Sequence, residues 1–222
     1  MNPHQVSEAD HRPGHDHTAR HGHHASLADG LDFVNTLEHG RHGSTDHLGS
    51  LATAVRWLHD HELLRGEMVA DQLRRYADDS AGEMRVLSRI RRVRAALREL
   101  LDATVEQRPA DEAALREVNR ALRAQYVYEL VPAPDGVSLD HRHEGDPIAG
   151  ALARLAEAIA RELTQADAER LRVCANDECR WVFFDSSPAG RRKWCDMATC
   201  GNRAKVARHR ARQRADAAGA DD

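Results

Sequence analysis

Apolar residues recur every three or four positions through most of residues 26–168, which is the spacing of one face of an α-helix. The pattern predicts helices over about 26–38, 50–58, 66–76, 83–105, 112–124 and 147–163. In the longest of them the apolar stripe consists of Leu87, Ile90, Val93, Leu97, Leu100, Leu101 and Val105, and five arginines lie mostly off it, at Arg89, Arg91, Arg92, Arg94 and Arg98. Asp111 and Asp146 are expected to cap the last two helices, the second of which has Pro147 in its first position.

The pattern changes to that of β-structure after the fifth helix. Residues 126–131 and 137–140 are rich in Tyr, Val and Leu and flank a Pro-Ala-Pro-Asp-Gly turn, which predicts a β-hairpin. We therefore expect residues 26–168 to form one mainly helical domain with a small β-hairpin. Residues 1–25 contain seven histidines and few apolar residues, so we expect a disordered arm that binds metal at most weakly, and residues 215–222 should form a disordered tail.

All four cysteines lie in one short window, as Cys174-x4-Cys179, fifteen intervening residues, and Cys195-x4-Cys200. Two close pairs joined by a loop can present four thiolates to a tetrahedral Zn²⁺ ion at about 2.3 Å each. Disulfides or free buried thiols are the alternatives, but a segment with so few apolar residues does not fold without a staple, and disulfides are disfavoured in the cytoplasm, where we expect the protein. Four sulfurs leave no position for water, so we expect one structural zinc ion and not a catalytic one.

The sequence around the cysteines predicts a treble-clef or ribbon-like zinc finger over residues 169–214. Residues 180–184 and 191–194 are expected to pair as two strands across a turn at 185–190, so that each strand presents one cysteine pair. The aromatic side chains that could shield the metal are Trp181, Phe183 and Trp194.

A basic helix should follow the last cysteine. Asn202 is its expected N-cap, and a strip formed by Ala204, Ala207 and Ala211 is expected to pack against the zinc site.

The finger segment is strongly basic, with twelve Lys or Arg and four acidic residues between Arg170 and Arg214, whereas the whole chain carries a net charge of −4. A basic end on an acidic body indicates a polyanionic partner for that end. No acid lies between 201 and 214 to form helical ion pairs, so a merely solvated charged helix explains the pattern less well than phosphate or guanine contacts. The candidate DNA contacts are Arg191, Arg192, Lys193, Arg203, Lys205, Arg208, Arg210 and Arg212.

The same residues resemble a known family, the CGNR zinc finger, whose name is the tetrapeptide at 200–203. The stretches that carry the resemblance are Leu171-Arg172-Val173-Cys174, Phe183-Phe184-Asp185, Arg191 to Met197, and Cys200 to Lys205. Upstream, residues 31–36 (LDFVNT) and Trp57-Leu58 are similar to the ABATE domain that usually precedes this finger. The resemblance implies a bacterial stress-responsive transcription regulator whose four cysteines bind zinc and whose finger binds DNA. The turn at 186–190 departs from the more basic turn of the family.

The N-terminal domain offers one weak candidate for a ligand site. Asp32, Asn35 and Arg41 lie near one predicted helix end, where their polar groups could meet a small-molecule effector. Asp32 and Asn35 could equally be capping or buried hydrogen-bonding residues. The sequence contains no phosphate-binding loop, Ser/His/Asp arrangement or HExxH motif, so we expect no enzymatic activity.

These patterns favour a DNA-binding transcription regulator whose first domain senses an unknown signal. Because one short module contacts little DNA, a homodimer is expected. An RNA- or ribosome-associated protein, an enzyme with an accessory finger, and a protein-binding zinc ribbon remain alternatives. The sequence contains neither an apolar run of about 18 residues nor a secretory signal, so we expect a cytoplasmic location without membrane contact.

Overall fold

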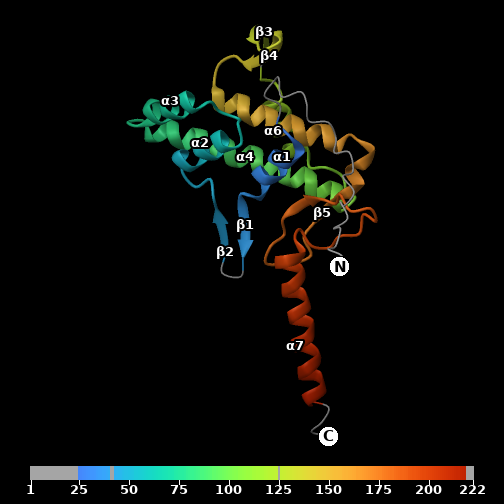
Figure 1. Cartoon of the computed structure of the whole chain (residues 1–222). Coiled ribbons are helices and arrows are strands. Elements are labelled where there is room, and N and C mark those ends of the chain that lie inside the picture. Colours follow the sequence, from blue (N-terminus) through green and yellow to red (C-terminus); the bar gives the residue numbers. More distant parts are fainter. Residues whose placement is uncertain (1–24, 41–42, 125, 219–222) are drawn as a thin grey trace, which may run out of the picture.

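The computed structural model describes residues 25–40, 43–124 and 126–218 (Figure 1). The elements in chain order are α1 (Leu27–Asn35), β1 (Leu37–Gly40), β2 (Gly43–Asp46), α2 (Leu51–Asp60), α3 (Gly66–Tyr76), α4 (Ser80–Val105), α5 (Glu112–Ala121), β3 (Tyr126–Ala133), β4 (Gly136–His143), α6 (Pro147–Leu163), η1 (Ala166–Arg170), β5 (Leu171–Val173), β6 (Val182–Phe184), η2 (Met197–Gly201) and α7 (Asn202–Ala218). The strands form three separate antiparallel pairs, β1–β2, β3–β4 and β5–β6. The predicted fold class, mainly α with small β-hairpins and a C-terminal zinc finger, is confirmed.

Helix α4 forms the centre of the helical body, where it contacts α1, α2, α3, α5 and α6. Its predicted apolar stripe is buried, with Ile90, Leu97 and Leu101 almost completely removed from solvent. The predicted N-caps are also present: Asp111 accepts a hydrogen bond from the N–H of the third helical residue, and Asp146 accepts one from the N–H of the second. The apolar periodicity and the capping residues therefore located the main helices correctly.

The first helix is shorter than predicted, and a hairpin that was not predicted follows it. Helix α1 ends at Asn35, because the Thr36 hydroxyl donates to the Phe33 carbonyl at 2.6 Å and the chain then extends into β1. Strand β1 pairs with β2, and Gly43 has a φ of +123°, which favours glycine. These four-residue strands are too short and too polar to show a two-residue period.

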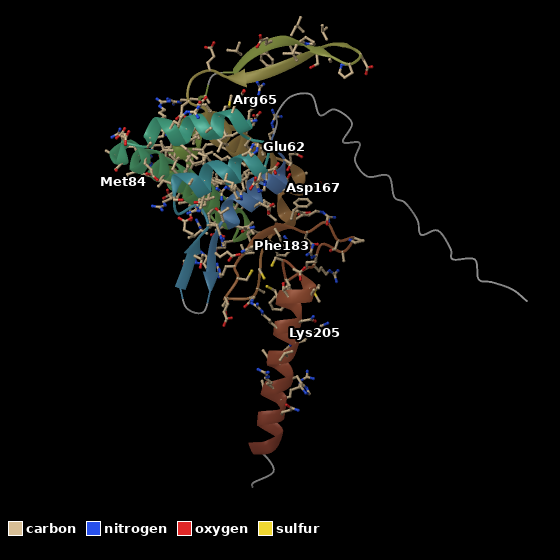
Figure 2. The ribbon with its side chains drawn as sticks, turned by 60° about the vertical axis from the view of Figure 1, so that its left-hand side comes forward. Glu62, Arg65, Met84, Asp167, Phe183 and Lys205 are labelled. Atoms are coloured by element: carbon tan, nitrogen blue, oxygen red, sulfur yellow. The ribbon has the colours of Figure 1, made fainter. Side chains whose placement is uncertain are left out.

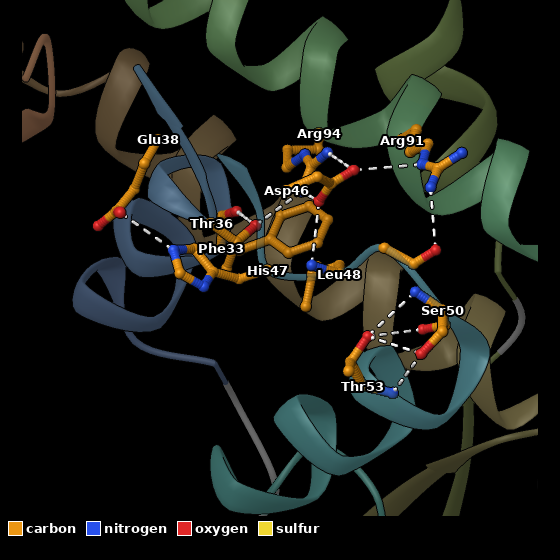
Figure 3. A network of polar contacts seen from close by, with 11 residues as sticks. Phe33, Thr36, Glu38, Asp46, His47, Leu48, Ser50, Thr53, Arg91 and Arg94 are labelled. Atoms are coloured by element: carbon orange, nitrogen blue, oxygen red, sulfur yellow. Dashed lines mark hydrogen bonds and ion pairs between the residues drawn. The ribbon is translucent and has the colours of Figure 1, made fainter. Parts of the chain in front are cut away.

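Arg94 is buried, although it was predicted to lie off the apolar stripe (Figure 3). Its guanidinium donates to both carboxylate oxygens of Asp46, at 2.7 and 2.9 Å, and to the Thr36 hydroxyl at 2.9 Å. Asp46 also accepts from Arg91 and from the Leu48 N–H, and the bonds from Arg94 lower the pKa of Asp46. The buried charge is thus paired, and the pair fixes the β1–β2 hairpin to α4.

The β5–β6 hairpin belongs to the same hydrophobic core as the helices. Leu171 and Val182 are each 1% exposed and lie in the main core cluster, against which Val173 and Phe184 also pack. Cross-strand pairing places these four side chains on one face of the hairpin, and Phe183 on the other. The predicted boundary at 168–169 lies within η1, and the core continues across it.

Helix α7 leaves the body and runs away from it, on the same side as the β1–β2 hairpin, whereas the predicted β3–β4 hairpin lies at the opposite end (Figure 1). It continues to Ala218, beyond the predicted end of the finger at 214, because neither glycine nor proline interrupts residues 202–218. The predicted arm at 1–25 lies, except for residue 25, outside the described residues, as does the tail after 218. None of the described helices combines the length and apolar content needed to cross a bilayer.

Candidate zinc centre and basic helix

The four cysteines meet at one point, with their Sγ atoms all within 4.8 Å of one another. The Cys179 and Cys195 sulfurs are 3.6 Å apart, and those of Cys195 and Cys200 are 3.8 Å apart. Four ligands at about 2.3 Å around a tetrahedral zinc ion would be about 3.8 Å from one another, so the spacing fits the metal. The cysteines form a single zinc site whose four sulfurs make it structural.

The first cysteine pair lies in the loop between β5 and β6. The Cys174 N–H donates to the Trp181 carbonyl at 2.8 Å, which closes the loop at the end of the hairpin. The Asn176 carbonyl accepts from the N–H groups of Cys179 and Arg180, and Arg180 has a φ of +56°. The Asn176 amide lies 3.6 Å from the sulfur of Cys200 and so links the loop to the second pair.

The predicted second strand at 191–194 is absent, and β6 pairs with β5 instead. A single backbone bond, from the Ala175 N–H to the Lys193 carbonyl at 2.8 Å, joins this segment to the first cysteine loop. Asp185 organises the connection: it is fully buried and accepts from the N–H groups of Ser187 and Arg192. A hydrogen bond from the Ser187 side chain, together with these two backbone bonds, lowers the pKa of Asp185 to about 2. A carboxylate thus fixes the connection that strand pairing was expected to fix.

Asp196, and not the predicted Asn202, caps the turn that carries Cys200. Its carboxylate accepts from the Thr199 N–H at 2.7 Å, and the chain then forms a π-helical turn, η2, before α7. Gly201 donates its N–H to the Asp196 carbonyl at 3.0 Å. A Cβ atom on Gly201 would lie 2.9 Å from the end of the half-exposed Met197 side chain, which would have to move to make room for it.

Aromatic side chains surround the sulfurs, as the sequence predicted. Phe183 is buried with Cys174 and Cys200, and Trp181 and Trp194 pack against this cluster. Burial raises the pKa of the Cys179 thiol to about 11 and raises that of Cys195 as well. Burial favours the neutral form of these two thiols, and a bound zinc ion would stabilise their thiolate form.

Arg192 differs from the other predicted DNA contacts, because it serves the finger itself. Its guanidinium donates to the Cys195 carbonyl at 2.5 Å and lies 5.1 Å from the centre of the Phe183 ring. Arg191 and Lys193 are exposed on the same segment. Helix α7 presents the remaining candidates to solvent, namely Arg203, Lys205, Arg208, Arg210 and Arg212. The structure therefore leaves seven of the eight predicted cations exposed.

The alanine strip of α7 does not pack against the zinc site. Ala204 is half-buried beside η2, but Ala207 and Ala211 are exposed. Figure 2 shows the cause, since α7 leaves the finger below Phe183 and projects beyond Lys205 without touching the body. The sequence pattern does not predict the π-helical turn before α7, so it could not predict the direction in which the helix projects.

Two of the three residues considered as a ligand site, Asp32 and Asn35, lie within the described residues and have different surroundings. Asn35 is 5% exposed, and its amide forms two bonds with Val182: Nδ2 donates to the carbonyl and Oδ1 accepts from the N–H, each at 2.9 Å. Asp32 is exposed on the same helix, and Arg41 lies outside the described residues. Asn35 is therefore a buried hydrogen-bonding residue, one of the two alternatives to a ligand contact, and it links α1 to β6 in the finger.

A hollow of about 430 Å³ lies between the β1–β2 hairpin and α4. Its lining includes Arg91 and Arg98, but Arg91 is paired with Asp46, and Arg98 with Asp102 at 2.8 Å. Asp46 is shared between Arg91 and Arg94, and the lining as a whole carries three arginines and three carboxylates, so its formal charges balance.

We predict that Asn35→Ala lowers the free energy of unfolding by about 1–3 kcal/mol, because the buried N–H and carbonyl of Val182 both lose their partner. Urea denaturation measures the change. Asp32→Ala, an exposed substitution on the same helix, should alter it by no more than about 0.5 kcal/mol. Equal effects of the two substitutions would contradict the link between α1 and β6.

We predict one zinc ion per chain by elemental analysis of the purified protein. Cys195→Ser should reduce the bound zinc well below one equivalent after dialysis, because a hydroxyl replaces one of the four thiolates. Ser186→Ala changes an exposed residue of the same segment and should keep the full content. Retention of zinc by the Cys195 variant would show that the metal lies elsewhere.

Comparison with known families agrees with this geometry. Residues 170–213 match the CGNR zinc finger, a segment that contains all four cysteines and most of α7. Residues 27–166 match the ABATE family, described as "Putative stress-induced transcription regulator". Among curated proteins, no sequence matches the chain. The chain belongs to the ABATE family, and its ABATE domain is followed by a CGNR zinc finger.

Proposed function

We propose that this protein is a transcription regulator that binds duplex DNA through α7 and the adjoining finger. The observation that carries the proposal is the helix itself, which projects from the body and exposes five cations between Arg203 and Arg212. No acidic residue lies between 201 and 214. Such a surface attracts phosphates by charge alone.

The dimensions of α7 also suit DNA. A helix of 17 residues is about 26 Å long and about 10–12 Å across, and the major groove of B-DNA is about 12 Å wide. Beyond its first turn, the described residues of α7 to 213 are exposed on all sides, so the helix can enter a groove without moving away from another element. Arg191 and Lys193, at the base of the helix, would reach a phosphate backbone.

In this proposal the ABATE domain controls the finger. The β5–β6 hairpin is shared between the helical core and the zinc site, so an effector that changed the packing of α1 or α4 would move the base of α7. We propose an unknown small-molecule effector and a homodimer, since a single finger covers too little DNA for tight specific binding. The proposal places the protein in the cytoplasm and assigns no chemical reaction to it.

RNA binding is the main alternative, and the position of the aromatic rings at the zinc site argues against RNA recognition by base stacking. Base stacking would need accessible aromatic rings, but Phe183 is buried and Trp181 and Trp194 pack around the sulfurs. The exposed cations of α7 could still contact an RNA backbone. A direct comparison of the two nucleic acids is therefore part of the test.

We predict that the zinc-loaded protein binds a short labelled duplex of mixed DNA sequence and that the affinity falls steeply with salt. Replacing Arg203, Lys205, Arg208 and Arg210 with alanine should reduce the slope of log K against log salt by about 0.9 for each phosphate that the variant no longer neutralises. Fluorescence anisotropy at several salt concentrations measures both quantities.

The matched control removes four exposed arginines from the helical body, by alanine substitution of Arg74, Arg75, Arg85 and Arg116. It makes the same change in net charge and should leave the slope nearly unaltered. If both variants lower the salt slope equally, the slope depends on the overall charge of the protein and not on α7. Tighter binding of matched double-stranded RNA would favour the RNA function, and no binding at all would leave the finger as a protein-contact module.

A further inference from the structure

The cations of α7 are arranged on two opposite faces of the helix. Successive residues are about 100° apart around a helix axis, so Lys205, Arg208 and Arg212 share one face. Arg203 and Arg210 are seven residues apart and lie about 180° from that face. A helix in a groove has a wall of phosphates on each side, and two opposite cationic faces match two walls.

Two narrow strips separate the cationic faces, and they differ in chemistry. One strip consists of Ala204, Ala207 and Ala211, which bear no polar side-chain atoms. The other consists of Val206, His209 and Gln213, all of which are exposed, Val206 at 48%. If the cations contact the two walls, one of these strips must face the floor of the groove.

Only the second strip can distinguish the four base pairs by hydrogen bonding. A glutamine amide can bond both N6 and N7 of adenine, an imidazole can donate to or accept from a base edge, and valine methyls can pack on the thymine methyl. The alanine strip offers methyl contacts alone. The two strips are equally accessible beyond the first turn, so their chemistry decides between them.

We infer that α7 reads DNA sequence with the strip Val206, His209 and Gln213, while Arg203 and Arg210 contact one phosphate wall and Lys205, Arg208 and Arg212 contact the other. The inference rests on the proposed DNA binding. Val206 and Gln213 are separated by about 10 Å along the helix axis, which corresponds to about three base pairs of DNA. Each finger therefore specifies about three consecutive base pairs.

The test is selection from a randomised duplex library, followed by measurement of affinity for the selected sequence and for mixed-sequence DNA. The wild type should select a short motif. The triple variant Val206→Ala, His209→Ala, Gln213→Ala should lose its preference for that motif by at least about tenfold. Its salt slope on mixed-sequence DNA should change by less than about one, because the five cations remain.

Two further variants separate the faces. Arg203→Ala with Arg210→Ala should select the same motif and lower the salt slope by about two. Ala207→Ser with Ala211→Ser alters the opposite strip and should keep both the motif and the slope. Zinc content and circular dichroism confirm that each variant is folded, and alanine favours the helix.

The possible failures are distinguishable. A triple variant that keeps the wild-type preference, or a serine variant that changes it, overturns the assignment of the reading face. A wild type that binds mixed DNA but selects no motif also overturns it, while DNA binding itself stands. If the wild type binds duplex DNA no better than the variant that lacks Arg203, Lys205, Arg208 and Arg210, the proposed DNA binding itself is wrong.

Discussion

The β5–β6 hairpin joins the two halves of the protein, because its two faces are buried by different partners. Leu171 and Val182 complete the core of the helical body, whereas Phe183 packs beside the zinc-binding sulfurs. Asn35 closes the junction with its two hydrogen bonds to Val182. Three-residue strands would not pair stably alone, so the helical core and the zinc site stabilise the hairpin together. The helical body and the zinc finger therefore share this hairpin.

The base of α7 is held at the zinc site, next to the π-helical turn. A helix with no tertiary contacts along most of its length gains little stability from packing, and only its first turn is anchored. The anchors are Cys200 at the zinc site, the cap at Asp196, and the hydrogen bond from the Gly201 N–H to the Asp196 carbonyl. Most of α7 therefore depends on its intrinsic helix propensity, which gives a helix of this length only marginal stability on its own.

Local chemistry in the sequence predicted the main helices, two of their N-caps and the zinc site. The structure departs from the sequence-based predictions where non-local contacts decide. Arg94 is buried because Asp46 reaches it from the β1–β2 hairpin, and Asp185 replaces a predicted strand with a set of hydrogen bonds. Asn202 fits a cap by residue type, but Asp196 takes that role one turn earlier. Asn35 and Val182 are separated by 147 positions in the sequence, so no local spacing pattern could predict their hydrogen bonds.

The shared hairpin is tested most directly by amide hydrogen exchange of the intact protein with zinc and after removal of zinc by a chelator. If the hairpin couples the two halves, loss of zinc should increase exchange in β5 and β6 and also at the end of α1 and in α4, which contact them. Increased exchange confined to residues 174–218, with α1 and α4 unchanged, would contradict the account and make the finger an independent module.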